Sequence, residues 1–297
     1  MRGFTLILNI KNKLKMKFRH VLLNLCIAVF AVSCSTDDNN DTPITNEIEG
    51  LIKIQEITNT THTIEFFNSA GNFKSGYNNL SIRIKDNATS NYIKNATLSW
   101  IPMMQMPTMQ HSCPKSEIAK TVGKETVYEG FIIYQMTNTD GSGWSLTVNY
   151  AIDGTDYTAS NDIVVLQSEK QNTTSFMGSD DNRYIIAMIE PNNPKIAINN
   201  LKVGLFKMES MMAFPVVEDY TITLDPRMPG MGNHSSPNNT DLSYNDEDYM
   251  YYGNLSLTMT GYWVLNLKLI NEQDAILKGE DVTETNEKSS LYLELEF

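Results

Sequence analysis

Cysteine is scarce in this chain of 297 residues, which has only Cys26, Cys34 and Cys113. Three cysteines are too few for a disulfide framework or for a zinc module held by thiolates. Basic residues are also few, because 23 Lys and Arg face 35 Asp and Glu and give a net charge of −12. Six basic residues and no acidic ones lie in positions 1–33, which leaves 17 basic against 35 acidic residues, or −18, on the rest. A body this acidic repels phosphate backbones, so nucleic-acid binding is excluded.

The chain also lacks the sequence motifs of common catalytic sites. It has no Gly-x-Ser-x-Gly elbow, His-Glu-x-x-His pair or glycine-rich phosphate loop. Beyond residue 33 the histidines are His62, His111 and His234, and His62 lies in an alternating segment that predicts a half-exposed sheet residue. The carboxylates at 246–248 indicate a solvated loop, with a calcium site as a minor alternative because the spacing of a calcium-binding loop is missing. We predict that the protein is not an enzyme.

The amino terminus has the pattern of an export signal. A positive region, residues 11–19, precedes an apolar stretch, residues 21–32, that is too short to span a bilayer comfortably. The segment 31–34, Ala-Val-Ser-Cys, resembles a bacterial lipoprotein lipobox, although Ala31 stands where Leu is usual. This resemblance implies a signal peptide over 1–33, lipidation of Cys34 and an outer-membrane location facing either side. An ordinary cleaved signal peptide is the alternative. Residues 34–49 are predicted to be a polar, acidic tether, similar to the export signals of Bacteroidetes lipoproteins.

The rest of the chain contains an internal duplication. The distance from His111 to Gly130 is 19 residues, and the distance from His234 to Gly253 is the same. Each glycine is followed six positions later by a Met-Thr pair and then by a tryptophan that opens an alternating apolar segment. Repeats of this kind indicate two copies of one structural unit. We predict domains over 50–168 and 177–297, joined by a linker over 169–176.

The periodicity of both copies is that of β-strands. Apolar residues alternate with polar ones over 144–150 and 291–297, and the Asp153-Gly154 pair supplies a hairpin turn. Short apolar segments bounded by Asn, Gly, Asp and Pro recur along each copy. We predict an all-β protein with two tandem immunoglobulin-like β-sandwich domains after the signal peptide.

Methionine is the residue in excess, with 16 in the chain. Two loops combine Met-Pro-x-Met with a histidine shortly after it, one at 106–111 and one at 228–234. Thioether sulfur is a soft, neutral donor that suits Cu(I), and imidazole binds both oxidation states of copper. Met136 and Met259, predicted to lie at the end of the next strand, offer further sulfurs. The predicted copper ligands are Met106, Met109, His111, Met136, Met228, Met231, His234 and Met259.

Simpler roles for these residues stay open. Methionine is a pliable apolar filler, and Met136 and Met259 share the parity of core residues on their strands. The nearby methionines 103, 104, 208, 211 and 212 are assigned first to packing or to a methionine-lined rim, with metal ligation as the minor alternative. Cys113 is either a third soft donor or an unpaired thiol.

The two methionine–histidine loops on a duplicated β-sandwich resemble the YtkA-like (FixH-related) domains of bacterial envelope proteins, which are similar to CopC-type periplasmic copper carriers. The resemblance covers about 80–150 and 200–270 and implies copper handling, with a copper-acceptor protein of the envelope as a possible partner. We therefore expect a copper chaperone, buffer or resistance factor with one ion in each domain, and the alternative stoichiometry is one ion clamped jointly by the two domains. The alternative is a lipoprotein that grips protein or glycan with its Met- and Tyr-rich loops.

Overall fold

A computed structural model describes residues 46–297, which form one compact unit. The predicted signal peptide, Cys34 and the tether as far as residue 45 lie outside the described residues. Within residues 46–297 the regular structure is β-strand, apart from one short 3-10 helix, η1 (Pro229–Met231). No helix in this part of the chain is long and apolar enough to cross a membrane. The predicted all-β class is confirmed.

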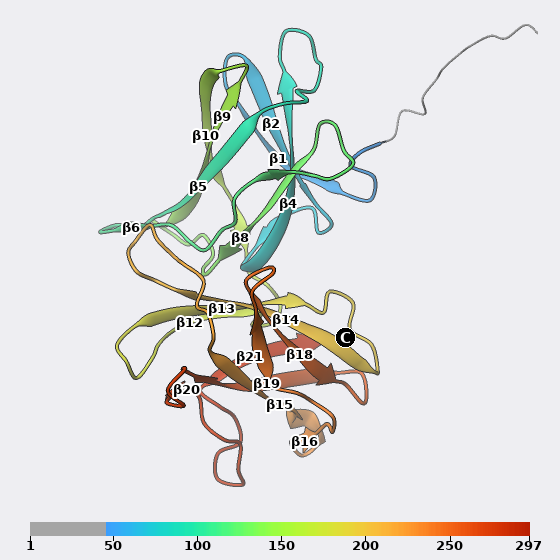
Figure 1. Ribbon diagram of the computed structural model, residues 1–297, viewed down its shortest axis with the longest axis vertical. Helices are drawn as coiled ribbons and strands as arrows, with labels where there is room; N and C mark the ends of the chain where they lie inside the picture. The colour runs from blue at the N-terminus through green and yellow to red at the C-terminus, as the bar shows by residue number, and fades with distance from the viewer. Residues whose placement is uncertain (1–45) are drawn as a thin grey trace, which may run out of the picture. The chain divides into compact units, whose positions relative to one another are not determined.

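The first half is a pair of facing antiparallel sheets (Figure 1). One sheet has the order β1-β2-β4-β8-β7 and the other has the order β10-β9-β5-β6, while β11 and β3 form a small parallel pair. The strands are β1 (Ile52–Thr58), β2 (His62–Asn68), β3 (Phe73–Lys74), β4 (Gly76–Asp86), β5 (Thr97–Gln105), β6 (Gln110–His111), β7 (Ala119–Lys120), β8 (Tyr128–Tyr134), β9 (Gly143–Ile152), β10 (Thr155–Ile163) and β11 (Val165–Leu166).

The second half repeats this arrangement with its sheets joined into one. Its strand order is β12-β13-β14-β18-β17-β15-β19-β20, with β16 paired to β15 and β21 paired to β19. The strands are β12 (Thr173–Met177), β13 (Arg183–Glu190), β14 (Ile198–Lys207), β15 (Thr221–Met228), β16 (His234–Ser235), β17 (Leu242–Asn245), β18 (Met250–Ser256), β19 (Tyr262–Ile270), β20 (Ile276–Lys278) and β21 (Leu291–Glu296).

The strand order identifies the immunoglobulin-like topology. In that fold strands A, B, E and D make one sheet and strands C, F and G make the other. The first half matches with β2-β4-β8-β7 as ABED and β5-β9-β10 as CFG. The second half matches with β13-β14-β18-β17 and β15-β19-β21. The predicted immunoglobulin-like sandwiches are therefore confirmed by topology, and each half has an additional hairpin strand, β1 or β12, before strand A.

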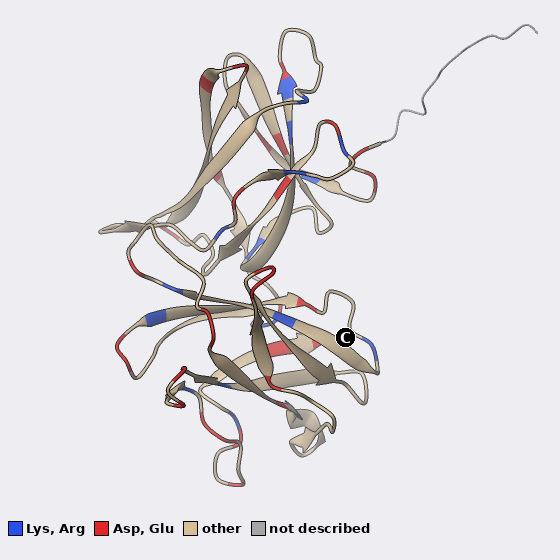
Figure 2. Cartoon of the chain, viewed as in Figure 1, with Lys and Arg blue, Asp and Glu red and all other residues tan. Residues whose placement is uncertain are grey.

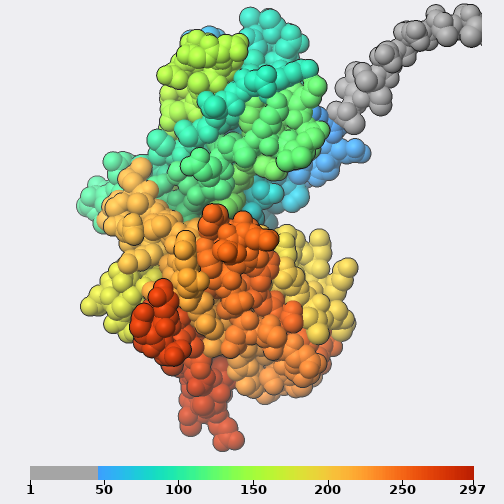
Figure 3. Space-filling view, in the orientation of Figure 1, coloured from blue at the N-terminus to red at the C-terminus, as the bar shows by residue number. Residues whose placement is uncertain are grey.

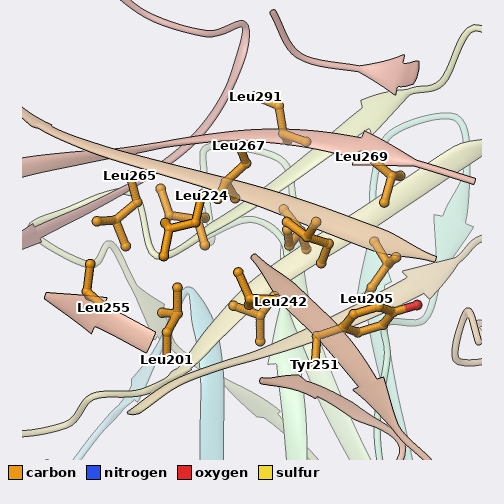
Figure 4. Close-up of a cluster of buried hydrophobic side chains, with 14 of the residues drawn as sticks. Leu201, Leu205, Leu224, Leu242, Tyr251, Leu255, Leu265, Leu267, Leu269 and Leu291 are labelled. Atoms are coloured by element: carbon orange, nitrogen blue, oxygen red, sulfur yellow. The ribbon is translucent and has the colours of Figure 1, made fainter. Parts of the chain in front are cut away.

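The cores follow from the alternation seen in the sequence. On β9 the side chains of Trp144, Leu146 and Val148 are buried while the residues between them are partly exposed, and β21 alternates in the same way. Figure 4 shows the leucine-rich core of the second half, where side chains from β14, β15, β18 and β19 meet. Burying these apolar side chains supplies the main stabilisation of each half.

The repeated glycines have a steric reason. A Cβ atom on Gly130 would lie 2.9 Å from the carbonyl oxygen of Glu117, and one on Gly253 would lie 2.7 Å from that of Thr240. In each half the chain segment beside strand E passes too close for any side chain at this position. The duplicated Tyr-x-Gly therefore preserves a close backbone approach.

A third apolar cluster joins the two halves. Ile133 of the first half packs with Ile185, Phe206 and Met250 of the second, and Phe131 lies 6.4 Å from Phe206 between ring centroids. All six residues at the centre of this cluster are buried. Apolar contacts therefore join the two halves within one compact unit.

The predicted tether and the predicted linker each make a hydrogen bond to the body of the protein. The carboxylate of Glu47, at the end of the predicted tether, accepts a 3.0 Å hydrogen bond from the amide of Thr126. In the predicted linker, the backbone amide of Gln171 donates to the side-chain carboxylate of Glu294 on β21, and its carbonyl oxygen accepts from the backbone amide of Glu294. The strand β12 begins at Thr173, inside the range assigned to the linker.

Candidate methionine site between the two halves

The first methionine loop is a tight hairpin between β5 and β6. The amide of Met106 donates to the carbonyl oxygen of Met109 at 2.9 Å, and Met104 pairs with His111 across the hairpin. Pro107 occupies the tip, where its fixed φ suits a turn and its missing N–H costs no ladder bond. Met106 is partly buried, and Met109 is 46% exposed. The hairpin therefore presents both sulfurs beside the imidazole of His111.

The imidazole of His111 is held in one orientation. Its Nδ1 lies 2.7 Å from the carbonyl oxygen of Ser112, and its ring meets Trp144 edge-on at a centroid distance of 5.8 Å. A carbonyl oxygen only accepts hydrogen bonds, so Nδ1 carries the proton in the neutral ring. The lone pair is then on Nε2, which is the arrangement found in metal-binding histidines whose other nitrogen donates to a backbone carbonyl.

Met136 reaches the same place from the end of β8. The indole nitrogen of Trp144 donates to the carbonyl oxygen of Met136 at 2.8 Å. The second half contains the same bond, from the indole of Trp263 to the carbonyl of Met259 at 3.1 Å. The duplicated tryptophan thus fixes the backbone at the duplicated methionine.

The second half contributes two methionines that the sequence had assigned to packing or a rim. The loop after β14 carries Met208 and Met211, and the amide of Ser112 donates to the carbonyl oxygen of Met211 at 2.7 Å. The amide of Met208 donates to the carbonyl of Arg183 at 2.9 Å. This loop therefore lies directly against the histidine hairpin, as the adjoining green and light-orange segments in Figure 3 show.

These residues surround a hollow of roughly 390 Å³. Its walls are mainly apolar, and five of the nine residues that form them are methionines. The lining residues are Met106, Met109, His111, Gln135, Met136, Ser175, Arg183, Met208 and Met211. All four first-half residues that the sequence predicted as copper ligands are among them. Six potential metal donors, five thioethers and one imidazole, are therefore gathered around one space.

The electrostatics of the hollow differ from those of the protein as a whole. The chain is strongly acidic, but the hairpin with β6 has no charged residue, as Figure 2 shows for that strand. Arg183 supplies the only formal charge among the nine lining residues, and its guanidinium makes a long hydrogen bond of 3.5 Å to Ser175. Among residues 46–297, three or more His, Cys, Asp or Glu side chains nowhere gather as a metal site. Any metal in the hollow would be bound by neutral donors.

The second methionine loop does not form an equivalent arrangement. Met228 is buried in the core of its half, Met231 is 57% exposed on η1, and His234 is exposed on β16. Met259 packs against the same core as Met228. Of the predicted second-half ligands, the structure brings none into the hollow.

The reason is the register of the strand that precedes the loop. Pro102 pairs with Leu146, and Pro226 pairs with Leu265, so these two prolines are equivalent. Met104 and Met228 both follow by two residues, both are buried, and both pair with the loop histidine. Met228 is thus the counterpart of the core residue Met104. The shared Met-Pro pair in the sequence matches Met228 to Met106 instead, and the strand register shows that this match is wrong.

Three other residues that the sequence singled out lie outside the lining of the hollow. His62 is buried, contrary to the half-exposed position we expected, and its Nδ1 lies 3.1 Å from the hydroxyl of Tyr150. Cys113 is enclosed in the first core, where burial raises the pKa of its thiol well above the ordinary value, and it does not line the hollow. In the 246–248 loop, Asp248 receives the ammonium of Lys202 at 2.8 Å.

The lining residues that the sequence did not predict as ligands are Met208, Met211, Gln135, Ser175 and Arg183. The two methionines carried a partial signal, since 208–212 contains three methionines in five positions. The other three carried none, because isolated polar residues on or beside strands are common on any surface.

Comparisons with known proteins add little to this description. No family model matches the chain, and no curated protein matches it. Among solved structures, the chain is similar to a chimeric titin Z1Z2-Z1Z2 tandem functionalized with an exogenous GRGDS peptide from fibronectin. That similarity has 10% sequence identity and a TM-score of 0.17, and it covers 83% of this chain and 97% of the other.

Proposed function

We propose that this protein is a lipid-anchored protein of the bacterial envelope that binds copper, as Cu(I), in the methionine hollow. The observation that carries the proposal is that Met106, Met109, Met136 and His111 line one space, with Nδ1 of His111 bonded to a carbonyl oxygen and the lone pair therefore on Nε2. The protein would act as a copper chaperone, buffer or resistance factor, without catalysis. Its other partner would be a copper-acceptor protein of the envelope.

The chemistry of the donors supports Cu(I). Thioethers are soft and uncharged, so they match a soft monovalent ion better than a hard divalent one. They also do not form disulfides in an oxidising compartment, where thiolates would be lost. The flexible methionine side chain lets several sulfurs approach one ion without a rigid cage. These properties suit reversible binding and transfer.

The proposed attachment is by lipid alone. The lipobox-like sequence that ends at Cys34 is the support for an acyl anchor, and the acidic segment that follows is the support for a tether. Two or more acyl chains hold a protein on a membrane stably without a spanning helix. Residues 46–297 would then carry copper in the aqueous space beside the membrane.

The test is an anaerobic titration of the fragment 35–297 with Cu(I) in the presence of a competing chelator. We expect binding tighter than about micromolar, a threshold that corresponds to about −8 kcal/mol. His111→Ala should abolish or strongly weaken it. His234→Ala is the matched control, because His234 is exposed and outside the hollow, and it should bind as the parent does.

One observation favours a second candidate, a binding module for an apolar segment of another protein. Methionine-lined surfaces adapt to varied apolar partners, and here Gln135, Ser175 and Arg183 supply polar groups at the wall. Copper binding weaker than micromolar in the titration would favour this role. A lower affinity for Cu(I) in His111→Ala than in the parent would favour the copper-binding role.

A further inference from the structure

We propose that the two halves share a single soft-metal site, in which Met208 and Met211 of the second half complete the ligand set begun by Met106, Met109, Met136 and His111. The inference rests on the proposed function and deepens it. It sets the stoichiometry at one ion per chain instead of the two that a repeated motif suggests. It also places ligands on a segment outside either Met-Pro-x-Met loop.

The two methionines line the same space as the histidine hairpin. Met208 and Met211 line the hollow together with the four first-half donors, whereas Met212 does not. Met211 is 44% exposed, so its thioether is free to move toward an ion. A bound Cu(I) needs only a few of these soft donors, and methionine's three rotatable bonds allow the set to adjust.

Hydrogen bonds hold the backbone of the methionine loop at its base and along its length. At its base the amide of Met208 donates to the carbonyl of Arg183, and within it the hydroxyl of Ser210 accepts the amide of Ala213 at 3.1 Å. The carbonyl of Met211 accepts the amide of Ser112, the residue next to His111. Ligands held by such supporting bonds lose little freedom when they bind.

An apolar interface joins the two halves beneath the site. Phe131 precedes Met136 on the chain, and Phe206 precedes Met208, and the two phenylalanines meet in the apolar cluster between the halves. The segments that carry ligands from the two halves are therefore anchored in one packed interface a few residues away. A site between the halves is held in place by the same contacts that join them.

The ligand class follows from the charges. The six donors are neutral, and the one formally charged lining residue, Arg183, is a cation. Coulomb repulsion from a guanidinium acts twice as strongly on a divalent ion as on a monovalent ion at the same place. We therefore assign the site to soft monovalent ions, Cu(I) and its analogue Ag(I), over Cu(II) and Zn(II).

The experiment uses the fragment 35–297, whose described part is one compact unit with its own cores. Parent, Met208→Leu, Met211→Leu and the double variant are titrated with Ag(I), and with Cu(I) against a chelator. Met212→Leu and Met231→Leu are the controls, since both residues are exposed methionines that do not line the hollow. Leucine conserves volume and removes only the sulfur, so folding should be retained, as thermal unfolding of each variant will show.

We expect one equivalent of ion per chain in the parent. The double variant should weaken binding by about tenfold or more, and each single variant by less because the remaining donors adjust, while the controls stay within about twofold of the parent, as expected for exposed side chains away from the site. X-ray absorption of the Cu(I)-loaded parent should show sulfur and nitrogen neighbours, with fewer sulfurs in the double variant.

Two results would overturn the shared site. A stoichiometry of two ions, one lost on changing each loop histidine, would place separate sites in the halves. Parent-like binding and sulfur count in the double variant would leave copper on the first half alone. Failure of the proposed function looks different, because the parent itself would then bind neither Ag(I) nor Cu(I), and both proposals would be rejected together.

Discussion

The backbone amide of Ser112 donates a 2.7 Å hydrogen bond to the carbonyl oxygen of Met211, a residue 99 positions later in the chain. The carbonyl of Ser112 in turn accepts the Nδ1 proton of His111. One residue thus connects the imidazole of the first half to the methionine loop of the second. Because both bonds use backbone groups, the relationship depends on how the halves pack and not on the side chain at position 112.

Metal binding is expected to stabilise both halves together. An ion present at about 100 times its Kd adds about 2.7 kcal/mol to the free energy of unfolding when it binds the native state alone. Since the proposed ligands come from both halves, thermal unfolding of the 35–297 fragment should stay a single transition that moves to higher temperature with Ag(I). Circular dichroism will show this, with His111→Ala as the unresponsive control. Splitting into two transitions, of which one moves, would argue against shared ligands.

Tyr134→Phe is expected to leave the protein as stable or to stabilise it by about 1 kcal/mol. The hydroxyl of Tyr134 is fully buried without a hydrogen-bond partner among the described residues, and burial raises its pKa well above the ordinary value. Removing an unpaired buried polar group removes its desolvation cost. Urea unfolding provides the measurement.

The matched control for that substitution is Tyr150→Phe. The hydroxyl of Tyr150 accepts the side-chain amide of Asn59 at 2.9 Å and lies against His62, so its loss should cost about 1–2 kcal/mol. Equal destabilisation by both changes would mean that the hydroxyl of Tyr134 also has a partner.

Cys113 is expected to be inert in the native protein and dispensable for copper. Its thiol is buried in the first core, and that burial raises its pKa, so the reactive thiolate is scarce. The fragment 35–297 contains no other cysteine, which makes a thiol reagent specific. Labelling should be slow at neutral pH and become rapid in denaturant, and Cys113→Ala should bind Cu(I) like the parent. A large loss of affinity in that variant would make the thiol a ligand.

Glu294→Gln is expected to destabilise the protein at neutral pH. Partial burial opposes ionisation of Glu294, but hydrogen bonds from the hydroxyl of Tyr262 at 2.6 Å and the amide of Gln171 at 2.9 Å outweigh it and lower its pKa. A lowered folded pKa contributes stability above the unfolded value of about 4.3, and this stability is lost as the pH falls through the folded value.

The effect should be modest because solvent screens this carboxylate, under about 1 kcal/mol at pH 7. Urea unfolding from pH 7 downward will show the difference shrinking as the pH drops below the ordinary glutamate range. Glu287→Gln is the control, since it makes the same charge change without the two hydrogen bonds. A difference that is constant with pH would mean that packing, not ionisation, is responsible.

Cys34→Ala is expected to abolish acylation, because no other cysteine follows the apolar stretch of the signal directly. Without acyl chains the protein should leave the membrane fraction, since an anchor of this kind depends on the buried hydrocarbon. Incorporation of labelled fatty acid and membrane partition are the measurements. A variant that still incorporates the label would show that the lipobox interpretation is wrong.

The sequence by itself determined the class of fold and four of the nine residues that line the hollow. Alternation over 144–150 and 291–297 requires strands with one buried face, and the duplicated spacing from histidine to glycine requires two similar units. The hairpin donors Met106, Met109 and His111 were readable because they lie within six residues of one another and share a local turn. A short sequence pattern indicates the geometry only of residues that are close together in the chain.

Only the tertiary structure decided which methionines share the hollow. Met228 matches Met106 in its Met-Pro pair, but the pairing of Pro226 with Leu265 places it in the core at the position of Met104. Side chains alternate between faces along a strand, so strand register, which is set by pairing with distant segments, selects the residues that reach a site. Met208 and Met211 joined the hollow because apolar surfaces far apart in the chain pack between the halves, and such long-range contacts leave no periodic trace in the sequence.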